Sequence, residues 1–232
     1  MSEFPTRSFP AITRSDMVEV DRVMIEDLGI SLLQMMENAG RNLADLAIER
    51  FSPTSVAVYS GPGGNGGGGM AAARHLHNRG VAVAVHLVRP DLGEVPAKQR
   101  STLDRMGVPV GEVGDAVPSV DLVIDAIIGY SLLGDPRADA ARAIEMINES
   151  RVPVLSLDTP SGLDVTTGRV GQPCVSATAT LTLAMPKTGL GIGRRQVGEL
   201  YVADISVPSD VYRAFAVRPE SWFQDGPIVR SA

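Results

Sequence analysis

The chain has 232 residues, 44% of them hydrophobic, which suits a single domain with a substantial core. Its formal net charge of -6 argues against a protein that binds nucleic acid by neutralising phosphates. The sequence contains no long apolar run and no secretory signal, and its single cysteine, Cys174, excludes an intrachain disulfide, so we expect a cytoplasmic protein that does not bind membranes.

The N-terminal part is predicted to be an irregular arm followed by two helices. Residues 1–11 contain two prolines and show no periodicity. A helix is expected to begin at Thr13 or Ser15, either of which can cap it, and to end at Gly29. A second helix is expected from Ser31, over SLLQMMENAGRNLADLAIERF, because its apolar residues recur at helical spacing. Most of that apolar stripe is interpreted as core.

After Pro53 the pattern changes to short apolar strands that alternate with helices. The strands contain β-branched residues and alanine without polar alternation, which is typical of a parallel sheet covered on both faces. We therefore predict a doubly wound α/β sandwich, whose ligands bind at the carboxyl ends of the strands. The predicted strands are 55–60, 81–88, 121–128, 152–158, 177–185 and 198–205, and the predicted helices are 69–79, 96–106 and 138–149. Residues 216–232 are expected to form an extension that lies on the body or on a partner.

A glycine-rich segment, GPGGNGGGG, follows the first of these strands. Gly61, Gly63 and Gly66 form a GxGxxG pattern between a strand and a helix, which is the context of a dinucleotide-binding loop. Backbone N–H groups in such a loop, together with the helix N-terminus, can approach a pyrophosphate. The acidic residue that usually follows about twenty positions later is not evident, which argues against an ordinary NAD-dependent dehydrogenase. The absence of GK[ST] after the glycines excludes a P-loop.

Three predicted strand ends carry polar residues. Asp125 lies inside an apolar run, where a carboxylate is costly to bury unless it is hydrogen-bonded to backbone amides or binds a cation. Asp158 and Ser161 can face one pocket, or they can simply shape a turn. Lys187 can hold an anionic group or neutralise nearby carboxylates. The residues alone leave these alternatives open.

Taken in order, MMENAG, GPGGNGGGGMAAARHL, IDAIIG, LDTPSGLDVTTG, PKTGL and VGELYVADISVP resemble the YjeF N-terminal domain family, the NAD(P)H-hydrate epimerases. The resemblance spans residues 12–215 and implies one domain with a Rossmann-like three-layer αβα sandwich, a mostly parallel central sheet and a homodimeric assembly. It also implies interconversion of the R and S forms of hydrated NADH or NADPH. The S form would then pass to a separate dehydratase.

The resemblance further implies a potassium ion beside the substrate, held by Asn65, Asp125 and Ser161. Asp158 is the expected catalytic acid and base, because the reaction needs a partly buried carboxylate with a raised pKa. The substrate-binding residues are expected to be Gly64, Asn65, Gly66, Gly67, Gly68, Gly129, Tyr130, Ser131, Leu132, Leu133, Gly134, Asp135, Asp158 and Lys187.

The glycine loop departs from the family pattern, GPGNNGGDG, at two positions. Gly64 stands where the family has Asn, and Gly68 stands where it has Asp. Losing a hydrogen bond to a charged acceptor costs about 1.5 to 3 kcal/mol. An alternative function is therefore a non-catalytic module that binds a nucleotide or docks on a partner protein.

Overall fold

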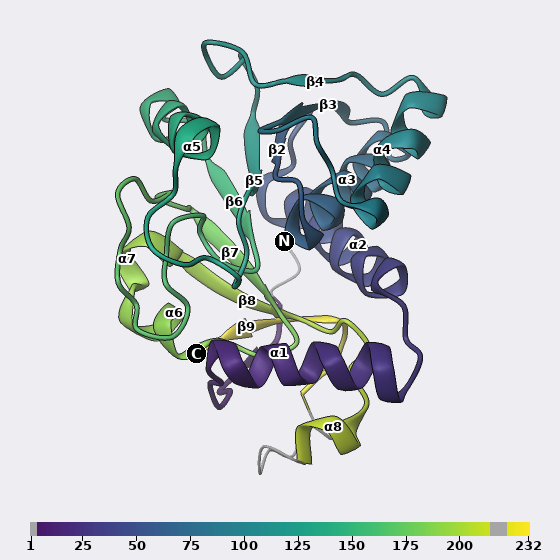
Figure 1. Cartoon of the computed structure of the whole chain (residues 1–232), viewed down its shortest axis with the longest axis vertical. Coiled ribbons are helices and arrows are strands. Elements are labelled where there is room, and N and C mark those ends of the chain that lie inside the picture. Colours follow the sequence, from purple (N-terminus) through teal and green to yellow (C-terminus); the bar gives the residue numbers. More distant parts are fainter. Residues whose placement is uncertain (1–3, 214–221) are drawn as a thin grey trace.

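The computed structural model describes residues 4–213 and 222–232, and one sheet of nine strands runs through this part of the chain (Figure 1). The strand order is β1-β9-β8-β7-β6-β5-β2-β3-β4, and all neighbours are parallel except β8 and β9. The strands are β1(Thr6–Arg7), β2(Ser55–Ser60), β3(Ala82–Leu87), β4(Val110–Glu112), β5(Leu122–Ala126), β6(Val154–Leu157), β7(Ala179–Leu183), β8(Glu199–Ala203) and β9(Ile228–Ser231). The predicted, mostly parallel sheet is confirmed.

The direction of winding changes beside β2. From β2 the chain proceeds to β3 and β4 on one side, and it then returns to β5 on the other side. In an open α/β sheet the crevice at such a reversal, outside the carboxyl ends of the strands, is where ligands bind. The glycine-rich segment follows β2 directly, so the fold brings it to this crevice.

Helices cover both faces of the sheet, as predicted for a three-layer sandwich (Figure 1). Helices α2, α3 and α4 lie on one side and α5 on the other. Alternate residues of β2 belong to different core clusters, with Val56 and Val58 on one face and Ala57 and Tyr59 on the other. This double burial explains why the strands lack polar alternation. The helices are α2(Leu32–Phe51), α3(Gly64–His77), α4(Glu94–Met106), α5(Ala138–Ser150), and the short α6(Thr188–Ile192), α7(Arg194–Val197) and α8(Ser209–Arg213).

The two N-terminal helices begin where the capping residues predict. Thr13 caps α1(Arg14–Arg22) and Ser31 caps α2, each through a reciprocal capping box. Helix α1 continues as a π-helix, η1(Val23–Asp27), before Gly29 turns the chain with φ of +68°. Helical spacing in the sequence does not distinguish a π-helical turn from an α-helical one.

Local structure departs from the predictions in the arm and at the start of α3. The described part of the arm, residues 4–11, is irregular except for β1, which pairs with β9; a two-residue strand is too short to leave a pattern in the sequence. Helix α3 begins at Gly64 instead of residue 69, so the glycines form its first turns. Glycine has a low helix propensity, and tertiary packing overrides it here. The short β4 also escaped prediction.

The C-terminal extension was predicted to lie on the body or on a partner. Residues 216–221 are outside the described part of the chain. Trp222 is buried against Phe9 and Tyr212, and β9 joins the sheet, so the described part of the extension packs on the body. Among the helices of the described residues, none has the length and apolar character needed to cross a lipid bilayer.

Candidate active site

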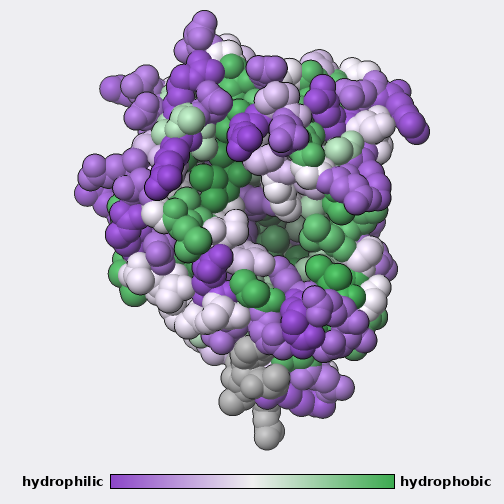
Figure 2. All heavy atoms as spheres, in the orientation of Figure 1, coloured by the Kyte–Doolittle hydropathy of each residue, from purple (hydrophilic) through white to green (hydrophobic). Residues whose placement is uncertain are grey.

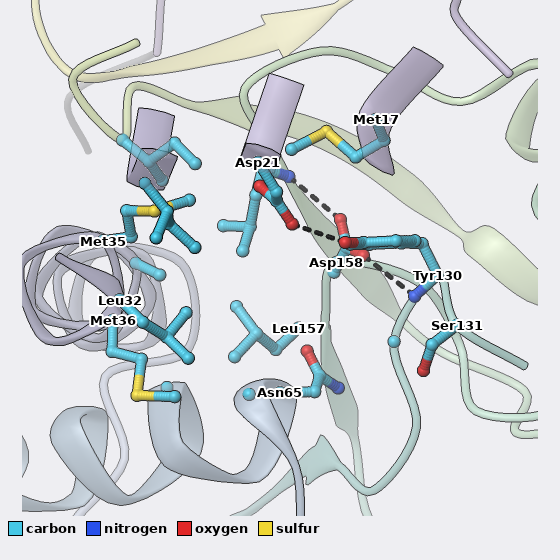
Figure 3. A pocket seen from close by; sticks show the side chains of 17 residues that line it. Met17, Asp21, Leu32, Met35, Met36, Asn65, Tyr130, Ser131, Leu157 and Asp158 are labelled. Atoms are coloured by element: carbon cyan, nitrogen blue, oxygen red, sulfur yellow. Dashed lines mark hydrogen bonds between the residues drawn. The ribbon is translucent and has the colours of Figure 1, made fainter. Parts of the chain in front are cut away.

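A cavity of about 410 Å³ lies at the predicted edge of the sheet, between the N-terminal helices, the start of α3 and the end of β6 (Figure 3). Figure 2 shows this face of the molecule hollowed, with hydrophobic residues around the depression. Most of the wall is apolar, and its two carboxylates, Asp21 and Asp158, come from helix α1 and from the end of β6. The cavity is lined by Met17, Asp21, Ile25, Leu32, Met35, Met36, Ala39, Gly64, Asn65, Gly68, Gly129, Tyr130, Ser131, Leu157, Asp158, Leu183 and Ile205.

Asp158 is the buried carboxylate at the end of β6. Its backbone has φ of +69°, in the left-handed region that residues other than glycine seldom adopt. Such strained conformations cluster at functional sites, where the surrounding structure holds them in place. The carboxylate accepts hydrogen bonds from Lys187 Nζ, Thr182 Oγ1 (3.4 Å) and the backbone N–H groups of Leu183 (3.3 Å) and Tyr130 (3.2 Å). Asp158 is therefore a fixed acceptor on the cavity wall.

Lys187 lies behind Asp158 and away from the cavity. Its side chain is fully buried, and Nζ also donates to Thr182 Oγ1 (3.1 Å) and to the Leu183 carbonyl (2.9 Å). Of the two interpretations of Lys187, neutralisation of a carboxylate is the one that the structure displays. The lysine was also predicted to bind substrate, and the structure places no part of it in the cavity lining.

The start of α3 contributes the glycines and Asn65. Gly64, Asn65 and Gly68 line the cavity, whereas Gly66 packs under Gly61 and Gly67 packs against Met36. No side chain caps this helix at Gly63, so its first N–H groups can meet an anion. The Nδ2 atom of Asn65 is buried and has no hydrogen-bond partner among the described residues.

Asp125 and Ser161 form a buried polar cluster next to this edge. Asp125 is fully buried at the end of β5, and burial raises the pKa of its carboxyl. It accepts hydrogen bonds from Ser156 Oγ (2.8 Å), from the N–H (2.9 Å) and Oγ (2.6 Å) of Ser161, and from the Ile127 N–H (3.2 Å). Hydrogen bonds at the strand end, one of the two alternatives for Asp125, are thus present.

The loop after β5 divides into two parts. Gly129, Tyr130 and Ser131 line the cavity, whereas the remaining predicted residues of the loop, 132–135, do not. Leu133 is 74% exposed, and Asp135 pairs with Arg169 (2.9 Å). Substrate contact by residues 132–135 stays a prediction.

Sequence reasoning missed the wall that the N-terminal helices provide. Leu32, Met35 and Met36 belong to the stripe that was mostly assigned to the core, and they also line the cavity (Figure 3). Asp21 lines the cavity as well and was not among the predicted site residues. It lies four residues after Met17, on the same helical face, so an acidic residue on a mostly apolar stripe was the available signal.

Comparisons with known proteins identify a family and several relatives that this chain resembles in sequence. The family model described as YjeF-related protein N-terminus matches residues 32–189. An NAD(P)H-hydrate epimerase of Dehalogenimonas lykanthroporepellens is 44% identical over 94% of this chain and 91% of the relative. A bifunctional NAD(P)H-hydrate repair enzyme of Hyperthermus butylicus is 39% identical over 91% of this chain, which spans only 42% of that relative's length.

The fold is also that of a solved structure. The crystal structure of the yeast protein ynu0 superposes with a TM-score of 0.86 and 25% sequence identity, covering 95% of this chain and 99% of that one. The family match covers the capped helix α2, the glycine-rich start of α3, Asp125, Asp158 and Lys187. On the sequence and the fold together, the chain belongs to the family of YjeF-related protein N-terminal domains.

Proposed function

We propose that this protein is an NAD(P)H-hydrate epimerase, which interconverts the R and S forms of hydrated NADH or NADPH. The observation that carries the proposal is the buried carboxylate of Asp158, held by four donors on the wall of an otherwise apolar cavity beside an uncapped helix start. An apolar wall suits the reduced nicotinamide ring, and a helix N-terminus suits the diphosphate. The relatives named NAD(P)H-hydrate epimerase support the same activity.

The chemistry centres on one carbon of the substrate, which carries the hydroxyl and adjoins the ring nitrogen. A proton delivered to the hydroxyl lets it leave as water, and the lone pair of the nitrogen stabilises the resulting cation. Water then adds to either face, which gives either epimer. In this proposal Asp158 exchanges the proton with the hydroxyl or the incoming water. General acid–base catalysis of this kind accelerates a reaction by about 10² to 10⁴.

The proposal includes a potassium ion bound by Asn65, Asp125 and Ser161. These residues fit a hard cation because they offer oxygen ligands: a carboxylate, a hydroxyl and an amide carbonyl. The orphaned Nδ2 of Asn65 supports the fit, because a flip of the amide would put its carbonyl oxygen in that buried position. When bound, the ion would supply positive charge beside the anionic substrate.

The proposal also covers assembly and partners. We place the S epimer as the substrate of a separate dehydratase, and the active form as a homodimer. The relatives named as bifunctional repair enzymes are longer than this chain, which is compatible with a second activity joined to the epimerase in those proteins. The free thiol of Cys174 is compatible with the reducing cytoplasm, where we place the protein.

A non-catalytic module is the second candidate, and the glycine loop favours it. At Gly64 and Gly68 the cavity wall has no side chain, although a Cβ at Gly64 would meet only Met36 Cε at 3.8 Å. The wall therefore has space for a Cβ at this position, and glycine leaves it without the amide that the family pattern has there. Such a module would bind the nucleotide without turning it over.

The deciding experiment supplies the pure R hydrate together with a dehydratase specific for the S form and follows the appearance of reduced cofactor. We expect acceleration above the spontaneous epimerisation, and a further increase when potassium replaces a larger organic cation. A rate equal to the background in both salts, combined with measurable binding of the hydrate, would support the non-catalytic module instead.

A further inference from the structure

A second carboxylate, Asp21, faces the same cavity as Asp158 but comes from helix α1 (Figure 3). Tyr130 connects the two groups. Its hydroxyl donates to Asp21 Oδ2, and its backbone N–H donates to Asp158 Oδ2 at 3.2 Å. The loop after β5 thereby places both carboxylates around one space, although they lie 137 positions apart in the sequence.

The environments of the two carboxylates differ. Asp158 accepts four hydrogen bonds, one of them from a buried ammonium group. Asp21 accepts one, from Tyr130, and its Oδ1 is buried without a hydrogen-bond partner among the described residues. Burial raises the pKa of Asp21, and the charge of Asp158 raises it further, against the lowering effects of Tyr130 and Lys187. Two carboxyl groups in unlike environments are the arrangement that divides acid and base roles.

A single acid–base group is poorly placed to catalyse inversion at a carbon. Water must leave from one face of the substrate ring and return on the opposite face. General acid–base catalysis needs a group within hydrogen-bond reach of the oxygen on each face. A ring held between two carboxyl groups satisfies this requirement without turning over in the site.

We infer that Asp21 is a second catalytic residue of the proposed epimerase, serving one face of the reacting carbon while Asp158 serves the other, with Tyr130 as the residue that positions Asp21. The inference rests on the proposed function. In one direction Asp21 gives its proton to the hydroxyl, the C–O bond breaks, and its electron pair leaves with the departing water. A second water then adds from the opposite face, and its extra proton passes to Asp158.

The reverse direction uses the same groups with exchanged roles. The substrate gains and loses one water per turnover, and the two carboxyl groups recover their starting protonation by exchange with solvent. No oxidant, reductant or further reactant is needed.

Because each turnover loses one water and gains another, the first part of the test compares inversion with oxygen exchange.

The experiment incubates one pure epimer in ¹⁸O-labelled water with wild type, Asp21→Asn or the control Glu19→Gln. Glu19 is an exposed carboxylate on the same helix that pairs, among the described residues, with Arg22, and it is outside the cavity lining. Chiral chromatography reports inversion, and mass spectrometry reports label in each epimer. A thermal unfolding curve of each variant establishes that it is folded.

We expect wild type and Glu19→Gln to invert and label both epimers. Asp21→Asn should lose inversion by about 10² or more, because it lacks an acid on one face. It should still exchange the hydroxyl oxygen of one epimer, because Asp158 can release and readmit water on its own face. Equal losses of inversion and exchange would assign Asp21 a merely structural role, and unchanged inversion would leave Asp158 as the group for both faces. If wild type does not invert the substrate above background, the proposed function fails and this inference fails with it.

The second part of the test uses Tyr130→Phe, which removes the hydroxyl but keeps the backbone N–H bond to Asp158. Since the hydrogen bond from Tyr130 lowers the pKa of Asp21, its removal should raise that pKa. Asp158 and Lys187, which also act on Asp21, remain, and so does Arg14, which acts on Tyr130. The limb of the pH–rate profile for inversion that reports Asp21 should therefore move to higher pH. A limb that stays in place, or that is absent from wild type, would contradict the inference.

Discussion

At the scale of single residues, the site depends on a buried ion pair. Asp158 and Lys187 are both shielded from solvent, and their side chains contact each other directly. Removing one partner of such a pair leaves an unpaired charge inside the protein, which costs about 3 to 5 kcal/mol. Removing both partners costs much less. This asymmetry allows catalysis and stability to be separated.

We predict that Asp158→Asn lowers the rate of epimerisation by about 10² to 10⁴ and also lowers the free energy of unfolding by about 3 to 5 kcal/mol. The double variant Asp158→Asn with Lys187→Met should recover most of the stability but none of the activity. Denaturant unfolding and the coupled dehydratase assay measure the two quantities. A single variant with near-normal epimerisation would rule out the role of Asp158.

The position of Asp158 in the site followed from its place at the end of a predicted strand, because strand ends meet at one edge of a parallel sheet. Its partner did not follow. Lys187 is 29 positions away and lies beyond β7, and sequence left it equally free to meet a ligand or a carboxylate. Only the path of the chain after β7 turns its ammonium group toward Asp158.

At the scale of elements, α3 shows why the glycines are required. A Cβ at Gly66 would lie 1.9 Å from the carbonyl oxygen of Gly61, and a Cβ at Gly61 would lie 1.9 Å from the carbonyl oxygen of Ile127. These neighbours are backbone atoms that cannot move without shifting β2 or the loop after β5. The helix therefore packs closely against the strand ends, and its N-terminus reaches the cavity.

We predict opposite effects for two alanine substitutions in the first turn of α3. Gly66→Ala should destabilise the protein by several kcal/mol or prevent folding, because its methyl group collides with backbone. Gly64→Ala has space for the methyl group and should be neutral or stabilising by up to about 1 kcal/mol, since alanine favours helices. Thermal unfolding of both variants checks this prediction. Equal destabilisation at the two positions would show that close packing is not the reason for the glycines.

At the scale of the whole molecule, the two ends of the described chain meet at one edge of the sheet. Strand β1 pairs with β9, and Phe9 packs edge-on against Trp222, with ring centroids 5.1 Å apart. Trp222 also contacts Tyr212, at 5.7 Å. This aromatic cluster joins the N-terminal arm to the C-terminal segment. It belongs to the same hydrophobic core as Met17 and Met35, which line the cavity.

We predict that Phe9→Ala loosens this end of the molecule. The loss of one aromatic contact and part of its buried area should cost about 1 to 3 kcal/mol, which lowers Tm by several °C in a domain of this size. Trp222 is the single tryptophan of the chain, so its emission reports the cluster directly and should shift to longer wavelength. The control Phe4→Leu changes a residue that packs on Tyr201 instead and should leave the emission unchanged. An unshifted emission in Phe9→Ala would mean that Trp222 is held without the arm.

The amino-acid sequence by itself determined the α/β class, the two capped N-terminal helices and the strand ends that carry Asp125 and Asp158. These features depend on local periodicity, capping residues and turn chemistry, which act over a few positions. Tertiary structure alone decided that Lys187 neutralises Asp158, that α3 starts within the glycines and that β1 joins β9. It also brought Asp21 and the methionines of α2 into the cavity. Each of these outcomes depends on contacts between segments far apart in the chain, where burial and steric fit outweigh local preference.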